Sequence, residues 1–278
     1  MPKVSIIIPV YRANDTIVDC LDSVIAQTLD DLEVLLVDDH GKDGSIDTAQ
    51  KHLNLYNGPI QFRFLETESY GSPGVTRNLG IQAASGDYIA FLDSDDTLDP
   101  TFCEKLYSAA NAANADLAYG HIFIDRSDGH SAIRKNPLIT SNTFEGRAKQ
   151  RYLRQFTSFF TTYLYKKNLL LDNGILFPNT HSAEDSSFLI CALLSAHRIT
   201  CVDEALYHYR IHANSISQKR DPRRWKNRLE SFRSMKEFAR QKGLYRPYHA
   251  VINWMIFKKG WLMAAKDFFR NNMRRASC

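Results

Sequence analysis

The sequence has few of the features that mark disulfide-rich, fibrous or membrane-spanning proteins. Its five cysteines are widely spaced and none stands in a C-x-x-C pair, so neither a disulfide framework nor a paired-cysteine zinc site is indicated. Thirteen glycines and nine prolines in 278 residues give no collagen-like or linker-like bias. No apolar run reaches 18 residues, which excludes a membrane-spanning helix within this sequence. The cysteine pattern favours a reducing cytoplasm.

The residues that are present describe a globular chain with an uneven charge. Hydrophobic residues make up 44% of the sequence, enough to bury a core. Residues 1–218 hold 18 lysines and arginines against 27 aspartates and glutamates, whereas residues 219–278 hold 17 against four. A block this basic needs solvent or an anionic neighbour. Nucleic acid, an acidic membrane surface and the chain's own acidic part are all candidates.

Apolar runs alternate with helical periodicity in the first half of the chain, which predicts an α/β fold with a mainly parallel sheet and helices on both faces. We expect strands at residues 4–10, 33–37, 60–65, 88–92 and 117–124, and helices from Asn14, after Ser45, at 75–84 and at 100–113. Residues 126–160 are polar and give no assignment. The later pattern predicts a strand at 162–166, a helix at 184–196, a strand pair at 199–202 and 205–210, and helices from about 222.

Carboxylates follow two of these strands and open a later helix, at residues 38–39, 93–96 and 184–185. In open α/β sheets the carboxyl ends of the strands face one crevice, so the first two groups are expected to meet at one ligand. Such oxygen ligands suit Mg²⁺ or Mn²⁺ shared with substrate phosphates. A solvated acidic turn that caps a helix is the alternative reading.

Several independent motifs surround these carboxylates. They are Ile-Ile-Ile-Pro9-Val-Tyr11, Gln27-Thr28, Leu-Val-Asp38-Asp39-x-x-x-Asp43-Gly44-Ser45, and the run from Gly71 through Arg77-Asn78 to Asp93-Ser-Asp95-Asp96. In order and spacing they resemble family 2 glycosyltransferases over roughly residues 1–125. The resemblance is looser at residues 180–218, where it rests on Glu184-Asp185-x-x-Phe188 and Tyr209-Arg210-x-His212-x-x-Ser215. It indicates little for residues 126–160 and 219–278.

The resemblance implies a GT-A type nucleotide-binding fold. We expect a transferase domain at residues 1–218, with a nucleotide-sugar-binding half at 1–125 and an acceptor-binding half at 126–218, followed by a basic helical extension at 219–278. The implied reaction moves one hexosyl or N-acetylhexosaminyl group from a UDP-sugar to a hydroxyl of a glycan or lipid-linked acceptor. It would proceed with inversion, depend on Mn²⁺ or Mg²⁺, and serve bacterial cell-surface polysaccharide or lipooligosaccharide synthesis.

The resemblance also assigns a nucleoside pocket. This pocket would be lined by Pro9, Val10, Tyr11 and Asp39, with the ring of Tyr11 against the base and the carboxylate of Asp39 accepting a hydrogen bond from it. For Tyr11, a core aromatic at the end of a strand is the competing interpretation.

The phosphate and sugar side of the donor site is assigned in the same way. Asp93 and Ser94 would face the ribose or the sugar, and Asp95, with Asp93 beside it, would hold the metal ion on the diphosphate. Arg77 would lie beside the donor, although an exposed helix cation is the alternative. A divalent ion and a guanidinium would stabilise the negative charge that develops on the departing nucleoside diphosphate.

An acceptor hydroxyl needs a carboxylate to take its proton, because its pKa lies far above neutrality. The resemblance gives this role to Asp185 and an orienting or acceptor-binding role to Glu184. The competing explanation is structural, since Ser182-x-x-Asp185 has the spacing of a capping box at a helix start. Weaker candidates are His208 and His212 as metal ligands, Arg210 in a lid, and His181 as an acceptor contact.

The basic tail combines aromatic and aliphatic residues at helical spacing. Its expected apolar stripe is Val251, Trp254, Met255, Trp261, Leu262, Ala265, Phe268 and Phe269, with Lys259, Lys266 and Arg270 on another face. Such a helix could bind an anionic membrane through residues 246–278 or dock on the acidic domain, and we expect the membrane. The protein would then lie in the cytoplasm at the inner face of the cell membrane.

Two other function classes stay open at this point. A nucleotidyltransferase also uses aspartate pairs beside a parallel sheet, although no Gly-rich triphosphate loop follows the first strand. A catalytically silent membrane-associated protein that binds nucleotide sugars is the other. We expect no nucleic-acid partner, since the domain has no recognisable binding module. The sequence gives no oligomeric state.

Overall fold

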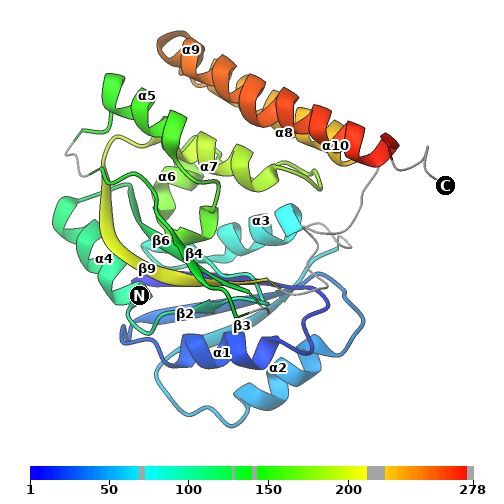
Figure 1. Ribbon diagram of the computed structural model, residues 1–278. Helices are drawn as coiled ribbons and strands as arrows, with labels where there is room; N and C mark the ends of the chain where they lie inside the picture. The colour runs from blue at the N-terminus through cyan, green and yellow to red at the C-terminus, as the bar shows by residue number, and fades with distance from the viewer. Residues whose placement is uncertain (69–72, 127–128, 140–142, 212–222, 274–278) are drawn as a thin grey trace.

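A mixed sheet of nine strands forms the centre of the computed structural model, which describes residues 1–68, 73–126, 129–139, 143–211 and 223–273 (Figure 1). The strands are β1 (Val4–Val10), β2 (Leu32–Asp38), β3 (Gln61–Glu66), β4 (Tyr88–Phe91), β5 (Thr97–Leu98), β6 (Leu117–Arg126), β7 (Ala132–Arg134), β8 (Tyr163–Lys166) and β9 (Ile199–Ile211). Their order is β3-β2-β1-β4-β8-β6-β9-β5, and β7 pairs with β6 outside this path.

The direction of the strands confirms a mainly parallel sheet. β1 is parallel to β2 and β4, β2 is parallel to β3, and β6 is parallel to β9. β8 runs antiparallel to both β4 and β6, and β5 and β7 are antiparallel edge strands. Val10 is paired with Asp38 at the end of β1, and Asp93 follows two residues after β4. The carboxyl ends of β1, β2 and β4 therefore meet at one edge.

One face of the sheet is covered by α1 (Ile17–Ile25), α2 (Ser45–Leu53) and α4 (Phe102–Ala113). Side chains alternate along a strand, so Ile6 and Ile8 of β1 pack into the core on this face and Ile7 packs into the core on the other. α1 and α2 lie below the sheet in Figure 1. The apolar side chains of α1 recur at helical spacing and are buried.

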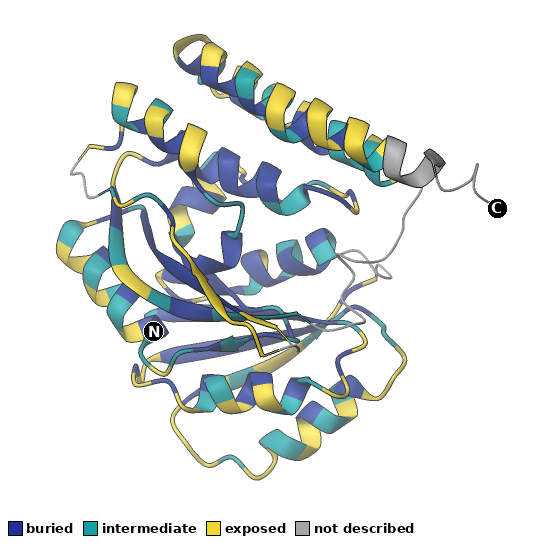
Figure 2. Ribbon diagram, in the orientation of Figure 1, coloured by how far each residue is buried: buried dark blue, intermediate teal, exposed yellow. Residues whose placement is uncertain are grey.

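The other face carries α3 (Pro73–Ala83), α5 (Gly146–Gln155), the short 3₁₀ helix η1 (Phe160–Thr162), α6 (Lys167–Asn173) and α7 (Glu184–Ser195). Every residue of α7 from Ser186 to Ser195 is buried. A helix that is buried all round must have neighbours on every side, and the colouring of Figure 2 shows α7 dark between the sheet and an outer helical layer.

The outer layer is the C-terminal extension. It consists of α8 (Arg224–Gln241), α9 (Tyr245–Met255), the π-helical turn η3 (Ile256–Trp261) and α10 (Leu262–Met273). Val251, Ile252 and Met255 are fully buried in the same core as α5 and α7. The extension is thus packed on the domain along part of its apolar stripe. No helix in the described ranges is long and apolar enough to cross a membrane.

Several predicted elements need correction. The expected strand pair at 199–202 and 205–210 is the single strand β9, which stays paired with β6 through register shifts near Gly120. The unassigned residues 126–160 contain β7 and α5, and α6 follows β8. α1 begins at Ile17 and not at Asn14, whose side chain instead accepts a hydrogen bond from the Thr48 hydroxyl.

Candidate active site

The predicted nucleoside pocket lies where β1 and β2 end. Pro9 and Val10 are buried in β1, and Asp39 is buried one residue after β2, with its backbone N–H donating to the Val10 carbonyl. Tyr11 is partly exposed, and the guanidinium carbon of Arg12 lies 5.2 Å from the centre of its ring. The backbone therefore brings all four predicted residues to the same edge of the sheet.

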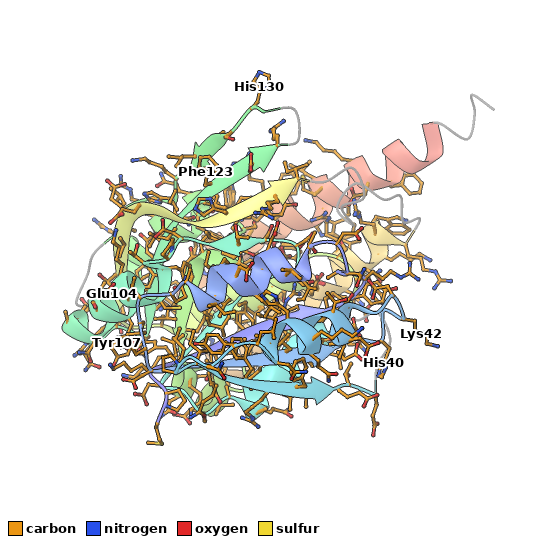
Figure 3. All side chains as sticks on the ribbon, turned by 90° about the horizontal axis from the view of Figure 1, so that it is seen from below. His40, Lys42, Glu104, Tyr107, Phe123 and His130 are labelled. Atoms are coloured by element: carbon orange, nitrogen blue, oxygen red, sulfur yellow. The ribbon has the colours of Figure 1, made fainter. Side chains whose placement is uncertain are left out.

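The loops beside this pocket hold an unusual backbone conformation. Arg12, His40 and Lys42 all have positive φ angles, of 53°, 56° and 54°. Such angles are costly for residues with side chains and cluster at functional sites. The two loops also touch closely, because a Cβ on Gly41 would lie 2.5 Å from the Arg12 backbone nitrogen. Figure 3 shows His40 and Lys42 at the opposite side of the molecule from Glu104 of α4.

Asp43 and Ser45 fix these loops to each other. The carboxylate of Asp43 accepts hydrogen bonds from the Asn14 backbone N–H and the Ser45 hydroxyl, and Ser45 accepts one from the Ala13 N–H. These bonds favour the ionised carboxylate and, against the effect of burial, lower the pKa of Asp43. The Asp43-Gly44-Ser45 motif thus fixes the loops that border the predicted nucleoside pocket.

The carboxylate turn after β4 presents two acids and buries a third. Asp93 and Asp95 are partly exposed, while Ser94 is buried and its carbonyl accepts a hydrogen bond from the Thr16 hydroxyl. Asp96 is 1% exposed and accepts bonds from the Tyr207 hydroxyl at 2.6 Å and the Arg210 backbone N–H at 2.9 Å. The turn is therefore anchored to β9 through Asp96.

The buried Asp96 and its partner Tyr207 fix the turn in place. Burial, together with the negative charges of Asp93 and Asp95, raises the pKa of Asp96 well above its usual value. Tyr207 stabilises both sides of the turn, because its hydroxyl also accepts a bond from the Asp93 backbone N–H. Sequence reasoning missed Tyr207, whose only signal was an aromatic residue inside a strand.

Arg77 stands between the donor carboxylates and the acidic start of α7. Its Nη2 lies 2.6 Å from Oδ1 of Asp93, and its side chain is 8% exposed. Its guanidinium carbon lies 4.8 Å and 5.5 Å from the ring centres of Phe160 and Phe177. Arg77 is thus a buried, aromatic-stacked cation and not the exposed helix cation of the alternative reading.

The charge on Arg77 is held by acids on two sides. Burial opposes the charge, but the carboxylates of Asp93, Glu184 and Asp185 outweigh it and raise the pKa of Arg77. Its buried Nε–H has no hydrogen-bond partner among the described residues. A buried donor left unpaired is costly, so this geometry suits an anionic ligand group.

The loop that leads into α7 is tied to α3 by Asn78. The Asn78 side chain donates to the Phe177 carbonyl at 2.9 Å and accepts from the Phe177 N–H at 2.8 Å. Gly74 of α3 permits the close approach, because a Cβ there would meet the Pro178 carbonyl oxygen at 3.0 Å. This amide clamp joins the Arg77-Asn78 motif to the acidic pair.

Glu184 and Asp185 form the first turn of α7, after Ala183 in a left-handed conformation with φ 63°. The capping box suggested for Ser182 and Asp185 is not formed: Ala183 is the N-cap and no side chain caps the helix. Instead, Oδ1 of Asp185 accepts from the Ser186 N–H at 2.6 Å. A strained, uncapped helix start that carries two acids is typical of a functional site.

Burial and mutual repulsion act on this pair. Burial and the charge of Asp185 raise the pKa of Glu184 to about 7, with Arg77 working in the opposite direction. Burial also raises the pKa of Asp185, while the Ser186 N–H and the charge of Arg77 act to lower it. Glu184 and Asp185 are partly exposed, and partly exposed carboxylates with raised pKa values are candidates for proton transfer.

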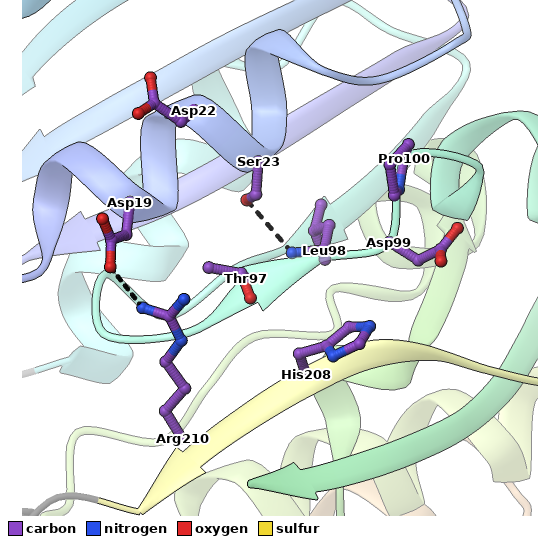
Figure 4. Close-up of a pocket in the computed structure, with 9 residues that line it drawn as sticks. All are labelled: Asp19, Asp22, Ser23, Thr97, Leu98, Asp99, Pro100, His208 and Arg210. Carbon is purple, nitrogen blue, oxygen red and sulfur yellow. Dashed lines mark hydrogen bonds and ion pairs between the residues drawn. The ribbon is translucent and has the colours of Figure 1, made fainter.

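Two of the weaker candidates lie on β9, next to the carboxylate turn. His208 and Arg210 line a cavity of about 440 Å³ with Asp19, Ser23 and Asp99, shown in Figure 4. Arg210 pairs there with Asp19 at 2.7 Å. This placement gives no support to a metal role for His208 or a lid role for Arg210.

His181 is exposed in the loop before α7. His212 lies outside the described residues, so the prediction of a second histidine ligand stays a prediction.

The carboxylates of Asp93 and Asp95 can contribute to a metal site but do not complete one. No group of three or more histidine, cysteine, aspartate or glutamate side chains within the described parts of the chain is placed to hold a metal ion. Mg²⁺ is usually bound by one or two carboxylates together with substrate phosphates and water. The donor set therefore fits an ion that is shared with a nucleoside diphosphate.

Comparison with known proteins identifies the family. The sequence profile of "Glycosyl transferase family 2" matches residues 5–171, which is more than half of the chain. The chain belongs to glycosyl transferase family 2. The resemblance seen in residues 1–125 is confirmed, and the matched range contains the nucleoside pocket, Arg77 and the carboxylate turn.

Similar proteins bear glycosyltransferase names. "Putative glycosyltransferase EpsH" of Bacillus subtilis (strain 168) is 27% identical over 282 residues, covering 99% of this chain and 80% of EpsH. The poly(ribitol-phosphate) beta-N-acetylglucosaminyltransferase TarS of Staphylococcus aureus (strain MW2) is 31% identical over 215 residues, covering 75% of this chain. The chain spans only 35% of the length of TarS.

Solved structures share the GT-A type α/β fold. The crystal structure of S. aureus TarS 1–349 in complex with UDP-GlcNAc aligns with a TM-score of 0.75 at 23% identity, over 92% of this chain and 73% of that one. Mannosyltransferase PcManGT from Pyrobaculum calidifontis, in complex with GDP-Man and Mn²⁺, aligns with a TM-score of 0.64 at 16% identity, over 96% and 74% of the two chains.

Proposed function

We propose that this family 2 glycosyltransferase moves one sugar from a UDP-sugar to a hydroxyl of a glycan or lipid-linked acceptor with inversion at the anomeric carbon. Asp185 takes the proton of the acceptor hydroxyl as its oxygen bonds to the anomeric carbon. The bond from that carbon to the diphosphate oxygen breaks at the same time, and UDP leaves with the electron pair. One displacement of this kind inverts the configuration.

The observation that carries this proposal is the position of Arg77. It is a buried cation in contact with Asp93 on the donor side, under the charges of Glu184 and Asp185 on the other, with an unpaired Nε–H. A guanidinium so placed stabilises negative charge as it develops on the diphosphate, next to the carboxylate that removes the proton. The nucleotidyltransferase and silent-binder alternatives have no comparable support.

The donor residues take the roles that their positions allow. Pro9, Val10, Tyr11 and Asp39 bind the nucleoside, and Asp93 and Ser94 lie beside the ribose and the sugar. Asp95, with Asp93, would hold Mn²⁺ or Mg²⁺, which would neutralise charge on the diphosphate. UDP is favoured because TarS is solved with UDP-GlcNAc. Residues 1–125 then serve the donor and residues 126–218 the acceptor.

The test combines donor binding with turnover. A panel of UDP- and GDP-sugars with Mn²⁺ is scored by thermal stabilisation and by release of the nucleoside diphosphate, with water as the acceptor. We expect a UDP-sugar to stabilise the protein and to be hydrolysed slowly. Asp185→Asn should keep the stabilisation and lose turnover by about 10²-fold or more. Full turnover of Asp185→Asn would contradict its role as the base.

We also propose that the extension binds an anionic membrane surface, which would place the protein at the inner face of the cell membrane. One part of its apolar surface packs on the domain, and another part stays exposed. Val251, Ile252 and Met255 are buried against the domain. The apolar residues that stay exposed on the extension are Phe257, Trp261, Leu262, Met263 and Phe268, and we refer to them together as the exposed patch.

The surroundings of this patch match a lipid surface. Lys258 and Lys266 are exposed beside it on the same continuous helix. Exposed aromatic residues next to lysines fit the interface of an anionic bilayer. A lipid-linked acceptor would bring its sugar to the same surface.

Vesicles of neutral and acidic lipids test this surface. We expect cosedimentation with vesicles that contain phosphatidylglycerol, and its loss in Phe257→Ser/Trp261→Ser. Ile133→Ser is the matched control, because Ile133 is equally exposed, at 56%, but lies on β7. Equal loss in the control, or no binding by the wild type, would contradict the proposal.

A further inference from the structure

The C-terminal extension contacts the domain along one side of a continuous helix. α9, η3 and α10 follow one another without a break, as the helix at the top of Figure 1 shows. Met255 of α9 is fully buried, and Lys259 of η3, one turn later, is partly buried. The Nζ of Lys259 donates a hydrogen bond to the Ser158 hydroxyl at 2.9 Å. Lys259 therefore lies on the side of the extension that contacts the domain, together with part of the apolar stripe.

α8 is fixed between this continuous helix and α7. The Nε of Arg228 in α8 lies 3.1 Å from Oδ2 of Asp267 in α10, and both side chains are mostly buried. Gly260 of η3 packs directly on the buried ring of Phe232, because a Cβ at Gly260 would already lie 3.4 Å from that ring. Phe232 and Met235 of α8 are buried in the same core as the side chains of α7. α8 therefore has a fixed position from which it can hold a neighbouring loop.

A buried serine of α8 contacts the turn that carries the acidic pair. Ser231 is fully buried, and its hydroxyl donates to the Ser182 carbonyl at 2.8 Å. Since this bond uses the only proton of that hydroxyl, the Thr180 hydroxyl donates to it at 2.5 Å. Beyond the acidic pair, the Ser187 hydroxyl donates to the Ser231 carbonyl at 3.0 Å. One residue of the extension thus holds both ends of this turn.

The turn between these contacts has a conformation that its own residues do not favour. Ala183 has a φ angle of 63°, and α7 begins without a side-chain cap. A strained backbone of this kind persists only where surrounding contacts impose it. The helical bond that closes the turn runs from the Ser187 N–H to the Ala183 carbonyl at 3.0 Å, so the serine that bonds to Ser231 also closes the turn. The position of Asp185, inside this turn, therefore depends on Ser231.

We propose that Ser231 is a positioning residue. Through its bonds to Ser182 and Ser187 it keeps Asp185 in the orientation from which the carboxylate accepts the proton of the attacking hydroxyl. A general base must lie within hydrogen-bond reach of that proton, so a small displacement of the turn is costly. The assignment rests on the proposed function for its consequence in catalysis. The bonds themselves do not depend on the reaction and can be tested separately.

Amide hydrogen exchange on the full chain tests the contact without any turnover. Ser231→Ala should speed exchange of the Ser187 amide about tenfold, because local opening of the turn costs less free energy, and should leave the amides of β1 unchanged. Ser234→Ala, at an exposed position of the same helix, is the matched control and should exchange like the wild type. Equal protection of the Ser187 amide in Ser231→Ala and the wild type would overturn the proposal, whatever the enzyme proves to transfer.

The separate effects on kcat and KM then test the catalytic consequence, with UDP release from UDP-GlcNAc and Mn²⁺ as the assay. Ser231→Ala should lower kcat about tenfold and change the KM for UDP-GlcNAc by less than about twofold, because the donor pocket is untouched. Ser187→Ala removes one of the same bonds from the α7 side and introduces a good helix former, so it should also lower kcat. It provides the same test if Ser231→Ala does not fold.

A second control separates positioning from a general loss of stability. Leu106→Ala, at a fully buried position of α4 on the opposite face of the sheet, should lower the thermal midpoint at least as far as Ser231→Ala and leave kcat at 25 °C unchanged. An unchanged kcat in Ser231→Ala, or an equal fall in Leu106→Ala, would refute the role of Ser231. Failure of the wild type to release UDP would count against the proposed function, with hydrogen exchange still deciding the contact.

Discussion

The proposed donor and acceptor sides of this site are built in different ways. The proposed donor side lies at the ends of three neighbouring parallel strands, where Asp38 is paired with Val10, the Asp39 N–H donates to the Val10 carbonyl, and Asp93 follows two residues after β4. The acceptor side depends on side chains that join distant segments, such as Asn78 to Phe177 and Ser231 to Ser182. A strand end keeps its geometry when single side chains change. A loop held by a few side-chain bonds does not.

The extension contacts the proposed acceptor side and contributes to its geometry. α8 fastens the Ala183 turn, whereas the described contacts of the nucleoside pocket come from β1, β2 and their loops. Damage to the extension should therefore affect stability and turnover before it affects binding of UDP. Four variants, from the largest expected effect to the smallest, test this division.

The first variant is Ile252→Ala, at a fully buried position of α9. Loss of the side chain should reduce the free energy of unfolding by about 3 kcal/mol, because it leaves a cavity in the core shared with α7. The control Phe257→Ala, at an exposed position of the same extension, should change it by less than about 0.5 kcal/mol. Urea denaturation measures both. Similar values would mean that the extension is not part of the core.

The second variant is Asn78→Ala, which removes both bonds to the Phe177 backbone. We expect a loss of stability of about 2 kcal/mol and a fall in UDP release, because the loop before Glu184 is no longer tied to α3. UDP should still stabilise the protein, since the donor strands are untouched. Gln82→Ala, at an exposed position of α3, is the control. Loss of UDP binding in Asn78→Ala would contradict the proposal that the donor side keeps its geometry when the acceptor side is disturbed.

The sequence was most informative where chain order and spatial order agree. The strand at residues 4–10 and the acids that follow β2 and β4 were predicted from apolar runs and strand geometry alone. α5 was missed because its exposed face is strongly polar, and even its buried Lys149 looks like a surface residue in the sequence. Lys149 is accommodated by donating to the Leu194 and Ala196 carbonyls at the end of α7.

The acceptor side could not be predicted for a related reason. Asn78 and Phe177 are 99 residues apart, and nothing local to either residue indicates the other. Ala183 has a positive φ that its residue type does not favour, so the turn is imposed by tertiary contacts. The π-helical turn at Ile256–Trp261 could not be predicted either, because the spacing of apolar residues there was read with the period of a regular α-helix.

The third variant, Glu184→Gln, gives a pH-dependent effect. The pKa of Glu184 rises from its ordinary 4.5 to about 7 on folding, so the folded state binds more protons between these values. Ionisation therefore weakens the fold as pH rises through this window, and the loss is complete above it. Glu184→Gln should gain about 2 kcal/mol at pH 8 and nothing below pH 4. A gain that does not vary between pH 4 and 8 would rule out this titration.

The smallest effect is expected on the donor side, at Asp19→Asn in the cavity of Figure 4. The Asp19 side chain is 60% exposed and its partner Arg210 is 31% exposed, so solvent and salt screen the pair. Its removal should change stability by less than about 0.5 kcal/mol, and 1 M NaCl should abolish even that difference. The pair of Arg77 and Asp93 has nearly the same length but is much more buried, at 8% and 30%. A large, salt-resistant loss in Asp19→Asn would mean that burial does not separate these two ion pairs, and that β9 is held to α1 by charge as firmly as the Asp93 turn is held to α3.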